Sequence, residues 1–191
     1  MRFHMATICS LGLLVLFTSF ALAQTSRAKH QIDVPYVPTT EAAVKAMLKL
    51  ADVSSSDTVY DLGCGDGRIV IAAAKEYGAH GVGIDINPER IQEAEENAKK
   101  AGVEKLVRFE ENDLFEADIH RASVVTLFLL SSVNLKLRPK LLTDLKPGTR
   151  IVSNTFDMGD WKPDKELTLD NSLDEEGLSH KFFLWIVPER K

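Results

Sequence analysis

The sequence predicts an α/β fold, because apolar strands alternate with amphipathic helices from residue 59 to Asn154. A glycine-rich turn at residues 63–67 joins the first buried strand to a helix, and the next strand ends in an acid about twenty residues later. Strands that are linked through helices pair in parallel, with right-handed crossovers. We therefore expect a Rossmann-like, doubly wound, mostly parallel sheet of seven strands with an antiparallel C-terminal strand.

The N-terminal segment is typical of a secretory signal peptide. Residues 1–23 combine a positively charged start, a mostly apolar stretch and the small-residue pattern Ala21-Leu22-Ala23. This predicts an exported or periplasmic protein, with a polar linker at residues 24–33 and one folded domain at residues 34–191. The alternative is an uncleaved anchor that holds the domain in the cytoplasm and near a membrane, although the stretch is short beside the roughly 20 residues of a spanning helix.

The composition is that of a globular domain without a basic surface. The chain has 191 residues, of which 45% are hydrophobic and 27% charged, and its net charge is -5. Nucleic-acid binders usually carry a basic face, so no nucleic-acid partner is expected. The two cysteines, Cys9 and Cys64, imply no disulfide framework. No Cys/His cluster has metal-ligand spacing, and no metal site is predicted.

Capping residues place the first three helices. Thr40 is a good N-cap for a helix in which Val44, Met47, Leu48 and Ala51 form a single apolar face. The helix after the glycine turn ends near Gly78, because glycine readily adopts the left-handed cap conformation. The third helix is predicted to begin at Asn87-Pro88 and to stop at Gly102.

The second half of the chain supplies the remaining elements. A third strand is expected at residues 107–110, and the near-continuous apolar run at residues 122–130 is typical of a central parallel strand. A helix is predicted for residues 135–145, with Pro139 in its first turn. The last three strands are predicted at residues 150–154, 165–169 and 181–187, and the final two form an antiparallel hairpin-like addition.

The charges of the glycine turn indicate what it binds. Asp61 and Asp66 bracket the turn, and two carboxylates would repel the diphosphate of a dinucleotide. The turn also departs from the dinucleotide fingerprint, because Gly67 comes one residue early. A ligand with an ammonium or sulfonium group suits these carboxylates. S-adenosylmethionine (SAM) carries both groups and an adenosine, and it has no phosphate.

Polar side chains follow the ends of the predicted strands. Asp85 ends the second strand, where a carboxylate can accept two hydrogen bonds from the hydroxyls of a ribose. The others are Asp61, Asp113, Ser131 and Asn154. Ligands of parallel α/β sheets sit at this edge, so we expect these side chains to border one site.

With these features, the chain resembles the class I, seven-strand SAM-dependent methyltransferases over residues 34–187. The segment Asp-Leu-Gly-Cys-Gly-Asp-Gly at residues 61–67 is similar to their first motif, Gly-Ile-Asp at residues 83–85 to the second, and Asn112-Asp113 to the third. The resemblance implies SAM as the cofactor and methyl transfer as the activity.

Further motifs resemble the mitochondrial ATP synthase c-subunit lysine methyltransferases. They are Pro-Tyr-Val-Pro-Thr at residues 35–39, Asp-Gly-Arg-Ile-Val at residues 66–70, the apolar residues 124–129, and residues 148–153 with the later Trp161. Ser131 stands where that family tends to show proline. This resemblance implies a protein lysine as the methyl acceptor.

Position and resemblance together assign the cofactor residues. Gly63 and Gly65 would face the methionine part of SAM, and Asp61 its ammonium group. The nucleoside would be held by Asp85 on the ribose, Ile86 on the adenine face, Asp113 on the adenine amine, and Asn112 or Leu114 beside the ring.

Candidates for the acceptor pocket are less specific, and no catalytic residue is assigned. They are Tyr36, Thr39, Ser131, Asn154 and Phe156. The acceptor is then a protein lysine or a small-molecule nucleophile. Two alternatives remain open: a small-molecule N- or O-methyltransferase, and a catalytically silent SAM-binding interaction module.

Overall fold

The computed structural model describes residues 37–169 and 180–190. Its helices are α1 (Glu41–Leu50), α2 (Arg68–Tyr77), α3 (Pro88–Ala101) and α4 (Ser131–Asp144). Its strands are β1 (Thr58–Leu62), β2 (His80–Asp85), β3 (Val107–Glu111), β4 (Val124–Leu127), β5 (Arg150–Asn154), β6 (Lys165–Leu169) and β7 (His180–Ile186). The predicted signal segment and linker, and the acceptor candidate Tyr36, lie outside the described residues. None of the described helices is long and apolar enough to span a membrane.

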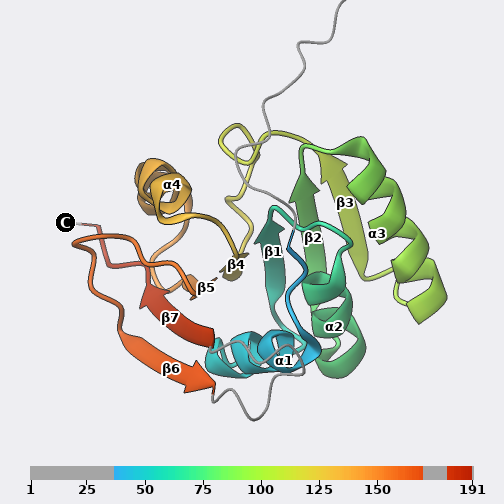
Figure 1. The fold of residues 1–191 in the computed structure, drawn as a ribbon, viewed down its shortest axis with the longest axis horizontal. Helices are drawn as coiled ribbons and strands as arrows, with labels where there is room; N and C mark the ends of the chain where they lie inside the picture. The colour runs from blue at the N-terminus through green and yellow to red at the C-terminus, as the bar shows by residue number, and fades with distance from the viewer. Residues whose placement is uncertain (1–36, 170–179, 191) are drawn as a thin grey trace, which may run out of the picture.

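The seven strands form one sheet in the order β3-β2-β1-β4-β5-β7-β6 (Figure 1). The first five pair in parallel, and β7 runs antiparallel to both β5 and β6. The predicted fold class is therefore confirmed, including the antiparallel strand near the C-terminus. The strand order reverses between β1 and β4, and this is the point at which open α/β sheets bind their ligands.

Two hydrophobic clusters cover the two faces of the sheet. Val59 packs in a cluster with residues of α1, α2 and α3, whereas its neighbour Tyr60 packs in a second cluster with residues of α4. Val124 and Val125 divide in the same way. Successive strand residues point to opposite faces, so continuously apolar strands are needed where helices cover both.

The predicted helix boundaries are mostly confirmed. The Thr40 side chain accepts a hydrogen bond from the Ala43 amide, and the Asn87 side chain accepts one from the Glu89 amide. Gly78 and Gly102 end α2 and α3 with positive φ angles of 71° each. These caps are local in sequence, which is why the sequence alone identifies them.

The region after β4 differs from the prediction. The strand covers only Val124–Leu127, and α4 begins at Ser131 with Leu130 as its N-cap, whereas a strand to residue 130 and a helix from residue 135 were expected. Pro139 lies inside α4. Pro139 has no N–H, so the Leu135 carbonyl receives no helical hydrogen bond from it. Leu135 is 46% exposed, and water can therefore replace that bond.

Candidate functional site

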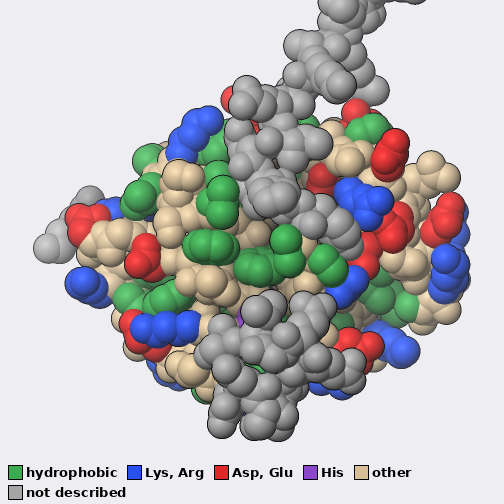
Figure 2. Space-filling view, in the orientation of Figure 1, with side chains coloured by type: hydrophobic (Ala, Val, Ile, Leu, Met, Phe, Trp, Pro, Cys, Tyr) green, Lys and Arg blue, Asp and Glu red, His purple; other side chains and the backbone are tan. Residues whose placement is uncertain are grey.

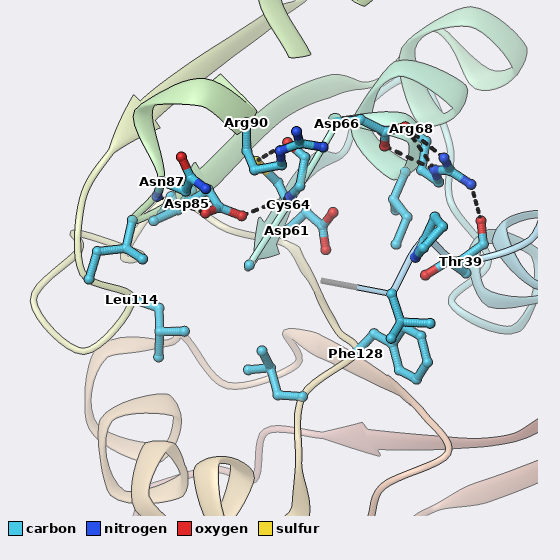
Figure 3. Close-up of a pocket in the computed structure, with 18 of the residues that line it drawn as sticks. Thr39, Asp61, Cys64, Asp66, Arg68, Asp85, Asn87, Arg90, Leu114 and Phe128 are labelled. Atoms are coloured by element: carbon cyan, nitrogen blue, oxygen red, sulfur yellow. Dashed lines mark hydrogen bonds and ion pairs between the residues drawn. The ribbon is translucent and has the colours of Figure 1, made fainter. Parts of the chain in front are cut away.

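A cavity of about 190 Å³ lies at the carboxyl ends of the central strands. Five segments form most of its lining: the residues before α1, the glycine turn, the end of β2, the end of β3, and the segment after β4. All seven residues that the sequence assigns to the cofactor line it, namely Asp61, Gly63, Gly65, Asp85, Ile86, Asn112 and Asp113. Figure 3 shows Asp85, Asn87 and Leu114 at one end, Thr39 and Phe128 at the other, and Asp61 between them.

The glycine turn is fixed to the neighbouring strand by its backbone. The amides of Gly63 and Cys64 both donate to the Ile84 carbonyl, at 2.8 and 2.9 Å. Gly63, Gly65 and Gly67 all have positive φ angles, of 84°, 52° and 79°. Residues with a side chain rarely adopt a positive φ angle, so glycines are used here and the turn brings bare backbone to the cavity.

Two glycines near the turn also serve packing. A Cβ atom on Gly67 would lie 2.7 Å from the Phe109 ring, and one on Gly83 would lie 2.5 Å from it. The Phe109 ring therefore packs where both residues lack a side chain. Neither Gly67 nor Gly83 lines the cavity, whereas Gly63 and Gly65 do, so packing and ligand access are separate demands on neighbouring glycines.

Asp85 is held with its carboxylate facing two donors. Its Oδ2 accepts from the Gly65 amide and its Oδ1 from the Asn87 amide, both at 2.9 Å. Each carboxylate oxygen has a second lone pair, so the group can still accept two hydrogen bonds from a ligand. Because its orientation is fixed before binding, Asp85 is suited to a pair of vicinal hydroxyls.

Asp61 is the buried carboxylate of the site, with 3% of its surface exposed. Burial raises its pKa to about 7, the negative charges of Asp85 and Asp66 add to the effect, and a 2.7 Å hydrogen bond from the Thr126 hydroxyl opposes it. A cationic ligand beside Asp61 would stabilise its charged form. The position therefore favours a ligand with an ammonium group.

Asp66 has a different role from the one its charge suggests. Its carboxylate forms an ion pair with Arg68 at 2.6 Å, and Arg68 also donates to the Thr39 carbonyl at 2.6 Å. The charge of Asp66 is therefore compensated, and the argument that both loop acids repel a diphosphate is wrong for Asp66. Of the two acids that bracket the turn, Asp61 alone carries that argument.

The other end of the cavity is apolar. Val37, Phe128, Leu129 and Val133 line it, and the Phe128 ring stacks on Phe156 with centroids 6.2 Å apart. Hydrophobic side chains gather in the middle of the face shown in Figure 2. Val37 is 51% exposed, so this end of the cavity opens towards solvent.

The acceptor candidates divide into three groups. Thr39 lines the cavity, and Phe156 packs behind Phe128 without lining it. Ser131 and Asn154 do not line the cavity either: Ser131 is the first residue of α4, and Asn154 is fully buried with its Oδ1 3.1 Å from His180 Nδ1. Asn154 ends β5 as expected, whereas Ser131 lies four residues beyond the end of β4, so its predicted position at a strand end is wrong.

Cys64 lines the cavity but is not set up for thiolate chemistry. Its side chain is buried, and burial raises the pKa of its thiol well above the ordinary value. Among residues 37–169 and 180–190, no group of His, Cys, Asp or Glu side chains is arranged to hold a metal ion.

Sequence reasoning missed three residues of the site. Thr126 is the one hydroxyl among the apolar residues 124–129, and that isolation was its only signal. Arg68 was noted only as part of the motif at residues 66–70. Phe128 was counted as part of a longer strand, although β4 ends one residue before it.

The strand order, the glycine turn and the acidic residues at the strand ends define a SAM-dependent methyltransferase. Comparison with known proteins agrees: the chain belongs to the family whose model is described as the ANTKMT methyltransferase domain, which matches residues 61–165.

The relatives of the chain are methyltransferases with different named acceptors. A protein-lysine N-methyltransferase of Saccharolobus islandicus is 46% identical, over 83% of this chain and 96% of the relative. An ATP synthase c-subunit lysine N-methyltransferase of Xenopus laevis is 36% identical, over 80% and 67%. A solved structure described as an RNA methyltransferase from Salinibacter ruber, in complex with S-adenosyl-L-homocysteine, is 54% identical, with a TM-score of 0.74 over 81% and 96%. The predicted resemblance and SAM as the cofactor are confirmed.

Proposed function

We propose that this protein transfers the methyl group of SAM to the lysine amines of a protein acceptor. The observation that carries the proposal is that one cavity has an apolar end, with Phe128 and Val37, and also contains the carboxylates of Asp61, Asp85 and Asp113. The lysine methyltransferases among its relatives support the same acceptor class.

We assign the nucleoside of SAM to the end of the cavity that contains Asp85. The two preset carboxylate oxygens of Asp85 would accept the ribose hydroxyls, and Ile86 and Leu114 would pack on the adenine. Asp113 already accepts from the Phe115 amide at 2.8 Å through Oδ1, which fixes its carboxylate and leaves Oδ2 for the adenine amine.

The methionine part of SAM would lie along the glycine turn. Gly63 and Gly65 bring the backbone close to it, and Asp61, held by Thr126, would bind its ammonium group. When bound, SAM supplies an electrophilic methyl group on a sulfonium. The chain holds this group in place between Asp61 and the apolar end, and such positioning contributes up to roughly 7–11 kcal/mol in favourable cases.

The apolar end would prepare the lysine. A lysine amine is a nucleophile only when it is neutral, and burial among apolar side chains lowers its pKa. Phe128, backed by Phe156, offers an aromatic face that can also contact a methylated ammonium through a cation–π interaction. Solvent at the open mouth beside Val37 can take the proton that the amine loses.

RNA is the second candidate acceptor, because the Salinibacter ruber relative is described as an RNA methyltransferase. The charges of this chain favour protein instead. Its net charge is -5, and the two arginines that line the cavity pair with carboxylates, Arg68 with Asp66 and Arg90 with Glu93. An RNA-binding site would need cations available for phosphates.

The test is a set of matched acceptor mixtures with labelled SAM. One mixture contains native proteins, the second contains the same proteins with their lysines reductively dimethylated beforehand, the third contains RNA, and the fourth contains small amines, acids and phenols. We expect label in the first mixture only, on lysine by mass spectrometry. The Asp85→Ala variant serves as the enzyme control.

Other outcomes would replace the proposal. Label that nuclease removes identifies RNA as the acceptor, and label only in the fourth mixture identifies a small-molecule enzyme. Binding of S-adenosylhomocysteine without transfer to any mixture would indicate a catalytically silent binding module.

We further propose that residues 1–23 direct export and are then removed, on the strength of their sequence pattern. The natural protein should then begin at Gln24 and be found outside the cytoplasm. Mass spectrometry of its N-terminus after cell fractionation measures both. An intact N-terminus in the membrane fraction would support the anchor instead.

A further inference from the structure

Arg68, the first residue of α2, connects two walls of the cavity. Its Nη1 donates to the Thr39 carbonyl at 2.6 Å, and its Nη2 and Nε donate to the Asp66 carboxylate at 2.6 and 2.9 Å. Thr39 belongs to the segment before α1, and Asp66 belongs to the glycine turn. One side chain therefore joins a segment from outside the sheet to the turn at its centre, as Figure 3 shows.

The segment held by Arg68 forms part of the apolar end. Val37, Pro38 and Thr39 all line the cavity, and Thr39 is 5% exposed. Thr40 follows at once as the N-cap of α1, so one end of the segment is fixed to a helix. Among the described residues, the Arg68 bond alone joins residues 37–39 to the glycine turn by hydrogen bonding.

The chemistry of the contact suits this connection. A guanidinium presents several N–H donors in one plane, so it can bind a carboxylate and a carbonyl at the same time with fixed geometry. The bond to Thr39 goes to the backbone, and it therefore sets the path of the segment whatever its side chains are. The Asp66 carboxylate orients the guanidinium and compensates its charge.

We propose that Arg68 is a positioning residue for methyl transfer: it clasps residues 37–39 to the glycine turn and so sets the width of the acceptor opening opposite Phe128. The inference rests on the proposed function for its activity readout. Displacements of about 1 Å in a methyl-transfer geometry cost on the order of 100-fold in rate. The clasp therefore matters more for the acceptor than for the cofactor.

The test compares Arg68→Met with a matched control, Arg108→Met. Arg108 also pairs with a carboxylate two residues away, Glu110 at 2.9 Å, but it lies on β3 outside the lining of the cavity. For Arg68→Met we expect kcat/KM for the acceptor to fall about 10- to 100-fold, whereas affinity for S-adenosylhomocysteine changes no more than about threefold. Arg108→Met should leave both unchanged.

A second measurement does not depend on the acceptor. Hydrogen–deuterium exchange should be faster at the Val37 and Thr39 amides in Arg68→Met (Pro38 has no amide hydrogen) and unchanged in α3, because loss of the bond to the Thr39 carbonyl lets this segment move. Arg68→Lys, which keeps the charge but not the planar donors, should give an intermediate loss, and it replaces Arg68→Met if that variant does not fold.

Two results would overturn the proposal. One is an Arg68→Met enzyme with unchanged exchange at residues 37–39 and unchanged kcat/KM. The other is a loss of S-adenosylhomocysteine affinity as large as the loss of kcat/KM, which would make Arg68 part of cofactor binding. If the wild type methylates no protein at all, the proposed function fails, while exchange and S-adenosylhomocysteine binding still decide the clasp.

Discussion

The two ends of the cavity are built in different ways. On the cofactor side, Asp85 ends β2 and the glycine turn follows its partner strand β1, and hydrogen bonds to the Ile84 carbonyl and from the Gly65 amide to Asp85 fix both. At the acceptor end, Val37 and Phe128 lie on segments that belong to no strand or helix, and side chains hold them. The sheet therefore determines cofactor binding directly, whereas the acceptor opening depends on contacts between distant segments.

The largest effect is expected at the nucleoside end, for Asp85→Ala. The change removes both acceptors for the ribose hydroxyls and also the partners of the Gly65 and Asn87 amides. Each hydrogen bond to a charged group contributes about 1.5–3 kcal/mol, so affinity for SAM should fall by 100-fold or more. Isothermal titration calorimetry measures this loss.

Asp85→Asn is the control for that change, because it keeps the shape and one acceptor oxygen and should bind SAM with intermediate affinity. If Asp85→Ala bound SAM as the wild type does, the ribose would have to lie elsewhere. The division of the cavity into a nucleoside end and an acceptor end would then be wrong.

A pH-dependent effect is expected at Asp61, between the two ends. Its pKa of about 7 in the free protein means that the carboxylate loses its charge as the pH falls from 8 to 6. A ligand that binds the charged form should then bind about tenfold more weakly at pH 6 than at pH 8. Fluorescence or calorimetric titration with S-adenosylhomocysteine across this range measures the slope.

Asp61→Asn should bind more weakly at pH 8 and lose the pH dependence, and a slope that persists in this variant would assign it to another group. The contribution of Asp61 to folding stability changes with pH in the opposite direction to ligand affinity. The folded pKa lies above the unfolded value, so the stability that Asp61 contributes is present at low pH and is lost as the pH rises through 7. Asp61→Asn should therefore stabilise the cofactor-free protein above pH 7, by on the order of 4 kcal/mol at most.

The nucleoside end could be predicted from the sequence because its residues follow from strand register. Leu62 pairs with Ile84 across β1 and β2, so the glycine turn and Asp85 must meet just beyond this pair. Once the two motifs are recognised as strand ends, their proximity needs no further information. The helix caps at Thr40 and Asn87 were predictable for the same reason, since each capping bond spans two or three residues.

The acceptor end could not be predicted in this way. Phe156 reaches Phe128 because Asn134 on α4 donates to the Phe156 carbonyl at 3.1 Å and so fixes the segment after β5. This arrangement depends on how α4 packs, and the sequence placed the start of α4 four residues too late. Position at a strand end identified Ser131 as a candidate, but it gave no information on where the side chain contacts the fold.

A moderate effect is expected at the acceptor end for Phe128→Ala. The change removes the aromatic wall of the opening and leaves the contacts of Asp85 intact. We expect kcat/KM for the protein acceptor to fall about tenfold, as for the loss of one well-packed aromatic contact of about 1.4 kcal/mol. Affinity for S-adenosylhomocysteine should stay within about twofold, and steady-state kinetics with binding measurements separate the two.

Phe156→Ala is the matched variant, because Phe156 supports Phe128 from behind and does not line the cavity. Its effect should have the same direction and be smaller. Equal losses of cofactor affinity and acceptor turnover in Phe128→Ala would mean that the two ends are not independent.

The smallest effect is expected from a pair of hydroxyls that the sequence could not tell apart, Thr39 and Ser131. Thr39 lines the cavity and is almost buried, so Thr39→Val, which keeps the shape, should lower acceptor kcat/KM about threefold through the loss of one polar contact. Ser131 begins α4 outside the cavity lining, and Ser131→Ala should leave cofactor affinity and turnover within error. Parallel kinetics of the two variants test this directly. A loss in Ser131→Ala that exceeds the loss in Thr39→Val would place the acceptor on the α4 side, and the opening would then be formed by the start of that helix and not by the segment that Arg68 holds.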